Sequence, residues 1–436
     1  AAFLGALAPA VAFGQAPTVA ACTADSTVLA AARRTNDYLD VLARHHELSA
    51  VVLVARGDCV LIERAFGLAR LAPRTPNTPA TRFAVASITK PLTVLVLDRL
   101  IRDGRLTLSD PIARWLPTFP RGDEITVGEL RDHRAGIPHR VTAPADEYRP
   151  HVAADLVALA AHQSLVAAPG TKTAYSTAGY AILARVLELA SGRPYAVLLE
   201  SLVFRPAKAS GAADATSGSI FPSPARSYVR VPGGFMSTRP QDLSYLVGGG
   251  SVYATSRDLF RIIRTLVVGG YSQTSRDSAL RNGRLDWTGI TDGYIAAAGY
   301  DSATELTTVT TANVYTGAIV HLHDDLLRLA AGEPIPPPTM PVIRAVRLSP
   351  AQQHRITGQY ETRPGETAVL AFMTPSLALF GGAHLIVTSD TTFGSLESYD
   401  ATVGVEHDAA GLITALRWTD QSRVTRYPRV APKKPE

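Results

Sequence analysis

Charged residues and cysteines are scarce in this 436-residue sequence, and no long run of one charge occurs. Asp, Glu, Lys and Arg together make up 19% of the residues, below the roughly 25% of an average soluble domain. Apolar residues reach 46%, enough to bury a large core, which excludes a mostly disordered chain. The net charge of +5 is small, whereas a nucleic-acid-binding protein would more often show a basic stripe. We therefore expect no nucleic-acid partner, and the length predicts roughly two or three domains.

Apolar runs long enough to cross a membrane, about 20 residues, are also missing. The sequence begins AAFLGALAPAVAFGQA, which is typical of the apolar part of a secretory signal, with small residues at Gly14-Gln15-Ala16 where cleavage would occur. A weakly helical, disordered N-terminus is the alternative for residues 1–22. The first interpretation predicts a secreted or periplasmic protein without a transmembrane segment.

The only cysteines are Cys22 and Cys59. In an exported protein these two could form one disulfide. Val19-Ala20-Ala21 before Cys22 also has the small-residue pattern of a lipidated cysteine, but Gln15 and Pro17 interrupt the apolar run ahead of it. Lipoprotein anchoring through Cys22 is therefore the less favoured interpretation, and two unpaired thiols are the third. Neither cysteine is a candidate nucleophile, because no histidine or Cys-x-x-Cys context surrounds it.

A cluster of prolines marks the clearest domain boundary. Residues 333–341 read EPIPPPTMP and predict an extended, semi-rigid linker. Before it, residues 27–46 have a helical pattern, and two apolar strands flank Arg56-Gly57-Asp58. After it, short apolar strands separated by Gly, Asp, Pro and Ser run through 342–430. The sequence predicts an α/β domain over 23–332 and a small all-β barrel or sandwich over 342–430.

Residues 88–102 predict a helix that begins next to Ser87. Gly104 stands where a C-terminal cap belongs, and Pro91 is acceptable only near the helix start. The expected buried stripe is Leu92, Leu95, Val96 and Leu100, and the side expected to face water is Asp98, Arg99, Arg102 and Asp103.

Ser87 and Lys90 form a Ser-x-x-Lys motif at the start of this helix. Residues three apart share a helix face, so the lysine amine can reach the serine hydroxyl. The positive end of the helix disfavours the ammonium, and a buried lysine can lose its proton near neutral pH and act as a base. Two further motifs follow in the chain, Tyr175-Ser176-Thr177 and Trp287-Thr288-Gly289.

The order of these three motifs resembles that of the penicillin-recognising serine hydrolases. Over about residues 27–330 the chain is similar to class C β-lactamases and to the β-lactamase-like esterases and D-peptidases. The resemblance implies an antiparallel sheet flanked by helices, a helical subdomain, and no metal or organic cofactor. It also implies that Ser87 is the acylated nucleophile, while Lys90 and Tyr175 share the proton transfers. The implied oxyanion hole consists of the backbone N–H groups of Ser87 and Ile290, and Gly289 would permit the close backbone approach.

Tyrosine is a poor base at neutral pH, because its ordinary pKa is near 10. Beside the ammonium of Lys90 we expect the Tyr175 phenolate to become more accessible, and the pair to titrate as a unit.

Two departures from the family pattern bear on the substrate. Many members have a basic residue or a histidine at the position of Trp287, where it meets the carboxylate of a β-lactam or peptide. Thr177 stands where asparagine is usual and offers one hydroxyl instead of an amide. We therefore expect an uncharged ester as substrate, and the Trp-x-Gly sequence is familiar among β-lactamase-like carboxylesterases. Trp287 could equally be a packing residue.

Two alternatives to an esterase stay open at this point. One is a D-amino-acid peptidase or amidase, or a weak β-lactamase. Another is a non-catalytic relative that binds a peptide or a glycan. Homo-oligomer formation is also left open by the sequence.

Other motifs carry less chemistry. His321-x-His323-x-Asp325 could suggest a metal site, but it falls in a helical pattern where His323 points away from the other two. Gly-x-Ser-x-Gly, the P-loop and the dinucleotide glycine fingerprint are missing. We expect His133 to be a structural loop residue.

The C-terminal part resembles a lipocalin-like domain through ITGQYE (356–361) and EHDAAG (406–411). Such a domain would cap the active-site cleft or stabilise a dimer.

Overall fold

The structure, a computed structural model, describes residues 26–45, 47–217, 224–231, 234–336, 344–363, 366–381, 383–395, 401–420 and 423–430. Segment 1–22, expected to be a signal-peptide remnant, lies outside these ranges, as does most of the expected linker. Cys59 is disulfide-bonded, while Cys22 lies outside the described residues. Within the described ranges, no helix combines the length and the apolar character needed to cross a membrane.

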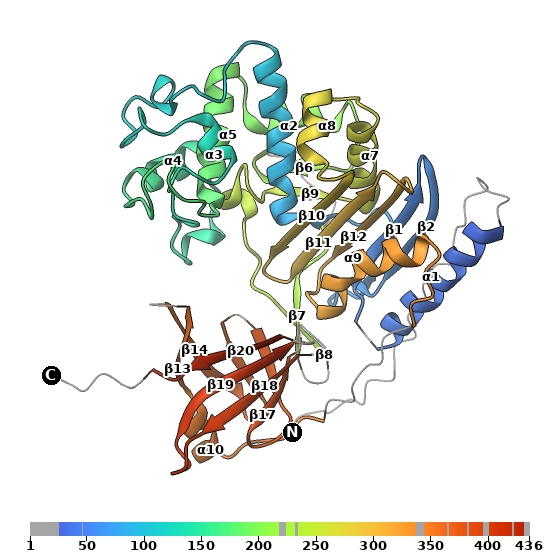
Figure 1. Ribbon diagram of the computed structural model, residues 1–436, viewed down its shortest axis with the longest axis vertical. Coiled ribbons are helices and arrows are strands. Elements are labelled where there is room, and N and C mark those ends of the chain that lie inside the picture. Colours follow the sequence, from blue (N-terminus) through green and yellow to red (C-terminus); the bar gives the residue numbers. More distant parts are fainter. Residues whose placement is uncertain are drawn as a thin grey trace.

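A five-stranded antiparallel sheet forms the centre of the larger domain (Figure 1). β1 pairs with β12 from Ala50↔Ala312 to Arg56↔Leu306, so the first and last parts of this domain meet in one sheet. β1 reads AVVLVAR and is buried almost throughout, because helices cover both faces of the sheet. The strands in spatial order are β10 (Arg284–Thr291), β11 (Tyr294–Asp301), β12 (Leu306–Ala312), β1 (Ala50–Arg56) and β2 (Cys59–Phe66).

Helices from both ends of the domain cover one face of this sheet. α1 (Ser26–Arg44) packs against α9 (Gly317–Ala330) and shares an apolar core with β1 and β2. α7 (Ser256–Val267) packs against β1 and β12 on the opposite face. The helix expected over 27–46 is therefore observed as α1, and the two strands expected around Arg56-Gly57-Asp58 are β1 and β2.

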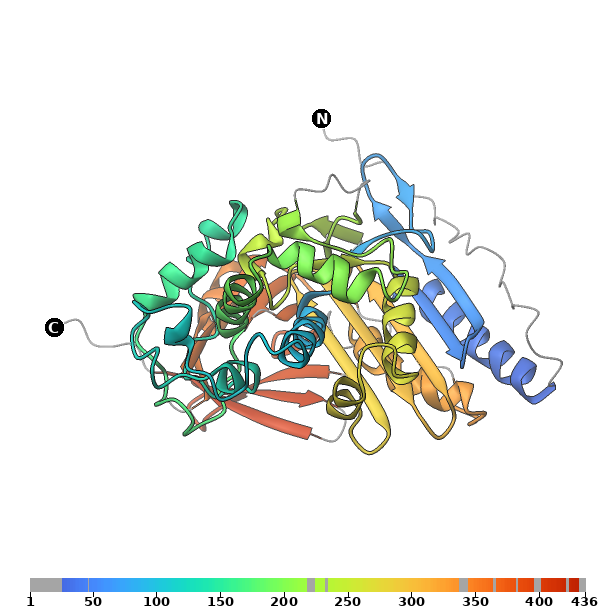
Figure 2. The same ribbon diagram turned by 90° about the horizontal axis from the view of Figure 1, so that it is seen from above.

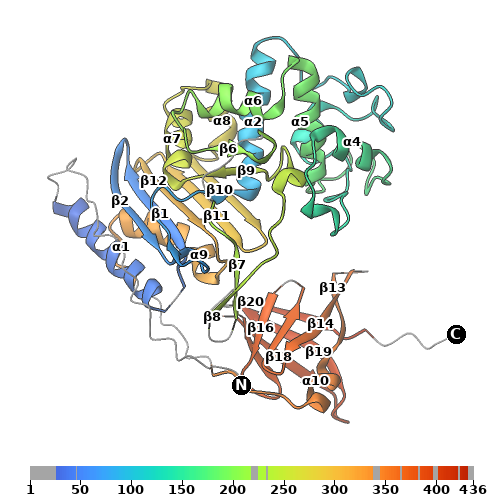
Figure 3. The same ribbon diagram turned by 180° about the vertical axis from the view of Figure 1, so that it is seen from behind.

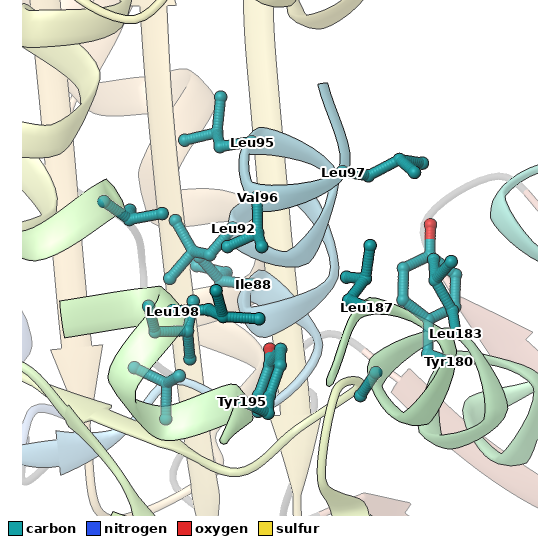
Figure 4. Packing of buried hydrophobic residues seen from close by; sticks show 14 of the residues in the cluster. Ile88, Leu92, Leu95, Val96, Leu97, Tyr180, Leu183, Leu187, Tyr195 and Leu198 are labelled. Carbon is teal, nitrogen blue, oxygen red and sulfur yellow. The ribbon is translucent and has the colours of Figure 1, made fainter. Parts of the chain in front are cut away.

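The remaining helices form a second lobe around α2 (Thr89–Arg102), seen beside the sheet in Figure 2. The expected apolar stripe of α2 is buried, and side chains of α5 and α6 point toward it (Figure 4). Asp98 differs from the expectation, because it is partly buried and accepts a hydrogen bond from Ser275 Oγ of α8 at 2.8 Å. The helices of this lobe are α3 (Val127–Arg131), α4 (Ala153–Ala161), α5 (Thr177–Ser191), α6 (Tyr195–Leu199) and α8 (Gln273–Ala279).

Several short strands and helical turns of the α/β domain lie outside its large sheet and its longer helices. β7 and β8 form a hairpin that extends from the α/β domain toward the C-terminal domain (Figures 1 and 3). The short strands are β3 (Leu68–Arg70), β4 (Thr75–Pro76), β5 (Phe83–Ala84), β6 (Ala213–Asp214), β7 (Tyr228–Val231), β8 (Gly234–Ser237) and β9 (Val252–Ala254). The short helical turns are η1 (Ala86–Ile88), η2 (Ile112–Arg114), η3 (Asp146–Tyr148), η4 (Glu200–Phe204), η5 (Ala215–Ser217) and η6 (Leu243–Leu246).

The C-terminal domain is a sheet of eight strands, paired in sequence order and nearly closed into a barrel. A bridge between Tyr360 and Arg429 joins its first and last parts. Inside, the Tyr360 and Phe380 rings meet edge to face at 5.9 Å between centroids. The expected all-β character is confirmed, although one helix, α10 (Pro350–Ile356), precedes the strands. These are β13 (Gly358–Arg363), β14 (Glu366–Thr374), β15 (Leu377–Phe380), β16 (Ala383–Val387), β17 (Thr392–Ser395), β18 (Ala401–His407), β19 (Ile413–Asp420) and β20 (Arg423–Pro428).

Candidate active site

Ser87 lies in η1, a tight turn between β5 and α2, whereas we expected it to flank an α-helix beginning at 88. Ala86 before it has φ 46°, a left-handed conformation that is uncommon for a residue with a side chain. Such backbone strain is frequent at functional sites, where the surrounding structure holds it in place. The turn leaves the Ser87 side chain partly accessible at the start of α2.

The Lys90 amine is buried, with the whole residue only 5% exposed. Its Nζ lies 3.2 Å from Ser87 Oγ, 3.2 Å from Thr177 Oγ1 and 2.8 Å from the Gly249 carbonyl oxygen. Within the described residues it forms no ion pair with a carboxylate. Burial therefore lowers the pKa of Lys90 from 10.5 to about 7, as expected for a lysine that acts as a base.

Tyr175 comes directly before the cap of α5 and donates a hydrogen bond from its hydroxyl to Ser87 Oγ at 2.8 Å. The Lys90 Nζ lies 4.7 Å from the centre of the Tyr175 ring. Burial raises the pKa of Tyr175 above its ordinary value, and the hydrogen bond with Ser87 only partly opposes this. The expectation of a more accessible phenolate is therefore wrong: Lys90 is the group that can lose its proton near pH 7.

Two histidines hold the tyrosine segment in place. His133 Nδ1 accepts a hydrogen bond from the Ser176 N–H at 3.1 Å, and its ring lies 4.5 Å from the Tyr175 ring. Burial, together with the nearby charge of Lys90, lowers the pKa of His133 to about 4, so this acceptor stays neutral at pH 7. The His139 ring packs against Tyr175 at 5.4 Å, and its carbonyl oxygen accepts the N–H of Thr177 at 3.2 Å. His133 thus has a structural position in the loop, as expected.

β10 lies at the edge of the sheet and packs against the turn that carries Ser87. A Cβ added at Gly289 would lie 2.1 Å from the Val85 carbonyl oxygen and 2.8 Å from the Ser87 nitrogen. Only glycine permits this approach, because both neighbours are backbone atoms. Thr288 and Ile290 are exposed beside Gly289 on this strand. The approach brings the N–H of Ser87 next to an edge strand whose outer side pairs with no other strand of the described residues.

Thr177 and Trp287 take positions that limit their contact with a substrate. The Thr177 hydroxyl is buried and accepts from Lys90, so it serves the lysine directly. Trp287 is only 8% exposed and belongs to the core that surrounds α2. Trp287 also lines a cavity of about 840 Å³, together with Lys90 and His133. Trp287 is therefore mainly a packing residue whose accessible edge faces this cavity.

The motif around His323 does not form a metal site in the described residues, where no group of three or more potential ligands gathers. His323 lies on α9 and is buried, with its Nδ1 2.8 Å from Thr308 Oγ1. Asp325 instead accepts a hydrogen bond from Tyr38 of α1 at 2.5 Å.

Comparison with known proteins agrees with this geometry. The beta-lactamase family model matches residues 31–322, and the chain belongs to this family. It is 28% identical over 255 residues to the putative penicillin-binding protein PbpX of Bacillus subtilis, covering 58% of this chain and 64% of PbpX. It is 33% identical over 201 residues to esterase EstB of Burkholderia gladioli, covering 42% of this chain and 50% of EstB. The chain thus spans about half to two thirds of the length of these relatives.

Solved structures show that the fold extends beyond the family match. The crystal structure of SurE is similar with a TM-score of 0.62 at 20% identity, covering 93% of this chain and 100% of SurE. Because this coverage includes the eight-stranded sheet, the combination of the two domains occurs in a solved structure. The expected fold class and the resemblance to the penicillin-recognising hydrolases are confirmed.

Sequence reasoning missed one group that contacts Lys90. The Gly249 carbonyl, in the GGGS segment before β9, accepts from the lysine amine. A Gly-rich run is a visible signal, but nothing in it indicates which residue will approach Lys90. His139 was also missed, because one histidine in a loop has no pattern that points to Tyr175.

Proposed function

We propose that this chain is an exported serine hydrolase that forms an acyl-enzyme on Ser87 and hydrolyses an ester that is uncharged near the scissile bond. The observation that carries the proposal is the position of Ser87 Oγ. It lies 3.2 Å from an amine whose pKa is about 7 and 2.8 Å from a phenol that stays protonated. A serine needs an adjacent base to become a nucleophile, and a lysine with this pKa is half neutral at pH 7.

The proton transfers follow from these positions. Neutral Lys90 accepts the Ser87 proton while Oγ attacks the carbonyl carbon of the ester. The Tyr175 hydroxyl, or the lysine ammonium through it, then gives a proton to the departing alcohol oxygen. In the second half, neutral Lys90 takes a proton from water while the water oxygen attacks the acyl carbon. Lys90, directly or through the Tyr175 hydroxyl, then returns this proton to Ser87 Oγ as the acid leaves. Each step begins and ends with the same number of protons.

We propose that the N–H groups of Ser87 and Ile290 stabilise the negative oxygen that develops in each step. This rests on the close approach of Gly289 to the Ser87 nitrogen and on the edge position of β10. Two preorganised N–H donors in such a site supply a large part of the catalytic effect in acyl transfer.

The preference for an uncharged reacting end rests on Trp287 and Thr177. Trp287 places an apolar ring where a cationic anchor would otherwise stand, and the Thr177 hydroxyl is occupied by Lys90. Neither side chain offers a positive charge to a carboxylate next to the scissile bond. The second candidate, a D-amino-acid peptidase or amidase, uses the same machinery and is tested by its own substrates.

The first experiment exposes the protein to a fluorophosphonate and maps the adduct by mass spectrometry. We expect the label on Ser87, and an adduct on a different residue contradicts the assignment.

The second experiment measures turnover of p-nitrophenyl acetate by the wild type, by Ser87→Ala and by Ser109→Ala as a matched control at an exposed serine. We expect only Ser87→Ala to lose activity, by at least about a thousandfold, because the covalent route is then closed. Equal rates in all three, or no turnover at all, would favour a non-catalytic binding relative.

A panel of D-amino-acid amides and a penicillin ranks the alternatives, and rapid penicillin hydrolysis would contradict the interpretation of Trp287.

Export is the remaining part of the proposal. It is supported by the Ala-rich start of the sequence and by the disulfide at Cys59, which is typical of oxidising compartments. N-terminal sequencing of protein recovered outside the cytoplasm should begin after Ala16. An uncleaved N-terminus in the cytoplasmic fraction would refute it.

A further inference from the structure

The cavity lined by Lys90 and Trp287 is also lined by Asp286 of β10 and by His323 and Asp324 of α9. Gly289 abuts the Ser87 turn, and Asp286 lies three residues earlier on the same strand. With a rise of about 3.3 Å per residue, the Asp286 end lies roughly 10 Å from the reacting position. The apolar part of the cavity wall is formed by Pro91, Val94, Leu95, Leu285 and Trp287.

At the far end, His323 has a tightly constrained position. Its side chain is only 8% exposed, its Nδ1 lies 2.8 Å from Thr308 Oγ1, and its ring covers Gly299 of β11. A Cβ at Gly299 would lie 1.7 Å from the ring, so a side chain there would displace the imidazole. The other nitrogen, Nε2, lies 4.0 Å from Asp286 Oδ1, which is too far for a hydrogen bond. The imidazole therefore lines the cavity with one nitrogen for which the described residues supply no hydrogen-bond partner.

Charges of both signs surround His323 without neutralising one another. Asp286, whose side chain is 73% exposed, and Asp324 of α9 line the cavity. Arg281 lines it too, and across the described part of the chain its guanidinium forms no ion pair. The cavity's other arginines have partners: Arg131 Nε lies 2.7 Å from Asp132, and Arg284 Nε lies 3.3 Å from Asp301. Among the described residues, two carboxylates and one guanidinium that line the cavity thus form no ion pair with a lysine, an arginine or a carboxylate.

We propose that the far end of the cavity binds a zwitterionic head group, an ammonium together with a carboxylate, at the end of an elongated ester or amide. The Asp286 and Asp324 carboxylates and His323 Nε2 accept hydrogen bonds from the ammonium, and Arg281 donates to the carboxylate. The apolar wall covers the chain between this head group and the scissile carbonyl. The inference rests on the proposed function, and it agrees with an uncharged reacting end because the residues that would hold the head group are not those that contact Ser87.

The experiment uses the full-length protein and two matched series of esters with a spacer of about 10 Å. The first series consists of four p-nitrophenyl esters. The octanoate has a methyl at its far end, the 8-aminooctanoate an ammonium, the monosuberate a carboxylate, and the ω-ester of 2-aminosuberate both charges. In the second series the same four ends are on the alcohol part of acetate esters, and hydrolysis is measured as acetate release. Both series are needed because either arm of an ester can lie along β10. In one of the two series we expect kcat/KM for the zwitterionic ester to exceed that of the methyl-ended ester by about tenfold, since partly exposed ion pairs contribute modestly.

Variants then assign the preference to individual side chains. Asp286→Asn combined with Asp324→Asn should reduce the ratio of zwitterionic to methyl-ended kcat/KM by about fivefold, through the ammonium end. Arg281→Gln should reduce the same ratio through the carboxylate end. Asp277→Asn, at an exposed carboxylate of α8 outside the cavity, is the matched control and should keep the wild-type ratio.

Equal kcat/KM for zwitterionic and methyl-ended esters in both series would overturn the inference, as would a ratio that these variants leave unchanged. Its failure is distinguishable from failure of the proposed function. Hydrolysis of the methyl-ended esters that depends on Ser87, without any effect of the head group, refutes only the head-group site. No turnover, or turnover that persists in Ser87→Ala, refutes the proposed function instead.

Discussion

Replacing Lys90 with methionine should make the fold more stable at pH 6 and less stable at pH 10. One pKa unit corresponds to about 1.4 kcal/mol, so lowering the Lys90 pKa from 10.5 to about 7 corresponds to on the order of 5 kcal/mol as an upper bound. This cost is fully present below pH 7, where the buried lysine must be charged in the folded protein. It disappears as the pH rises toward 10.5, because the lysine of the unfolded chain then also becomes neutral.

Methionine removes this cost, but it also leaves the Gly249 carbonyl and the Thr177 hydroxyl without the lysine donor. An unpaired buried polar group costs about 1–3 kcal/mol, and at about 1–2 kcal/mol each these two groups together cost about 2–4 kcal/mol. At pH 6 the relief of the buried charge is larger, so we expect a gain in unfolding free energy of about 1–3 kcal/mol. At pH 10 only the lost hydrogen bonds remain, so we expect a loss of similar size.

Urea denaturation of the wild type and Lys90→Met at pH 6, 8 and 10 measures this difference, since other titrating groups cancel between the two proteins. Activity toward p-nitrophenyl acetate, measured in parallel, should be lost at every pH. A stability difference that does not change with pH would refute the reasoning, because Lys90 would then have the same pKa in the folded and unfolded chains.

Three further predictions concern the same site. Wild-type kcat/KM for p-nitrophenyl acetate should fall about tenfold per pH unit below pH 7, where Lys90 becomes protonated, and a limb centred near pH 9 would contradict this. Gly289→Ala should lower kcat/KM at least about a hundredfold, because its Cβ would meet the Val85 carbonyl at 2.1 Å and shift β10 from the nucleophile. Gly404→Ala is the control, because a Cβ added there would have its nearest neighbouring atom at 4.0 Å. Equal losses in kcat/KM for the two variants would count against the close approach of Gly289. Thr177→Val, which keeps the shape but removes the acceptor for Lys90, should lower kcat about five- to tenfold with little change in thermal unfolding, and an unchanged kcat would show that the hydroxyl is dispensable.

Local patterns in the sequence were enough to predict the elements that carry the site. The apolar stripe of 88–102 predicted α2, because a helix must bury one face, and the Ser-x-x-Lys spacing placed the amine near the hydroxyl. The same reasoning failed for Asp98, since a helix pattern cannot show that α8 will cover a position from the far end of the domain. It also failed for the Tyr175 phenol, because the degree of burial that raises its pKa depends on side chains distant in sequence.

Burial and charge pairing at the site were decided by the tertiary structure. Burial lowers the pKa of Lys90 to about 7, and the groups around its amine include Gly249 and Thr177, which lie 159 and 87 residues away along the chain. The gathering of Arg281, Asp286, His323 and Asp324 at one end of a cavity has no signature in the sequence. Patterns along the chain determined the order of the elements and, through the resemblance carried by three ordered motifs, the family. They also indicated Ser87, Lys90 and Tyr175 as candidate reacting groups, because such patterns depend on neighbours in the sequence. The protonation states and the chemistry of the cavity depend on neighbours in space, and only packing defines which those are.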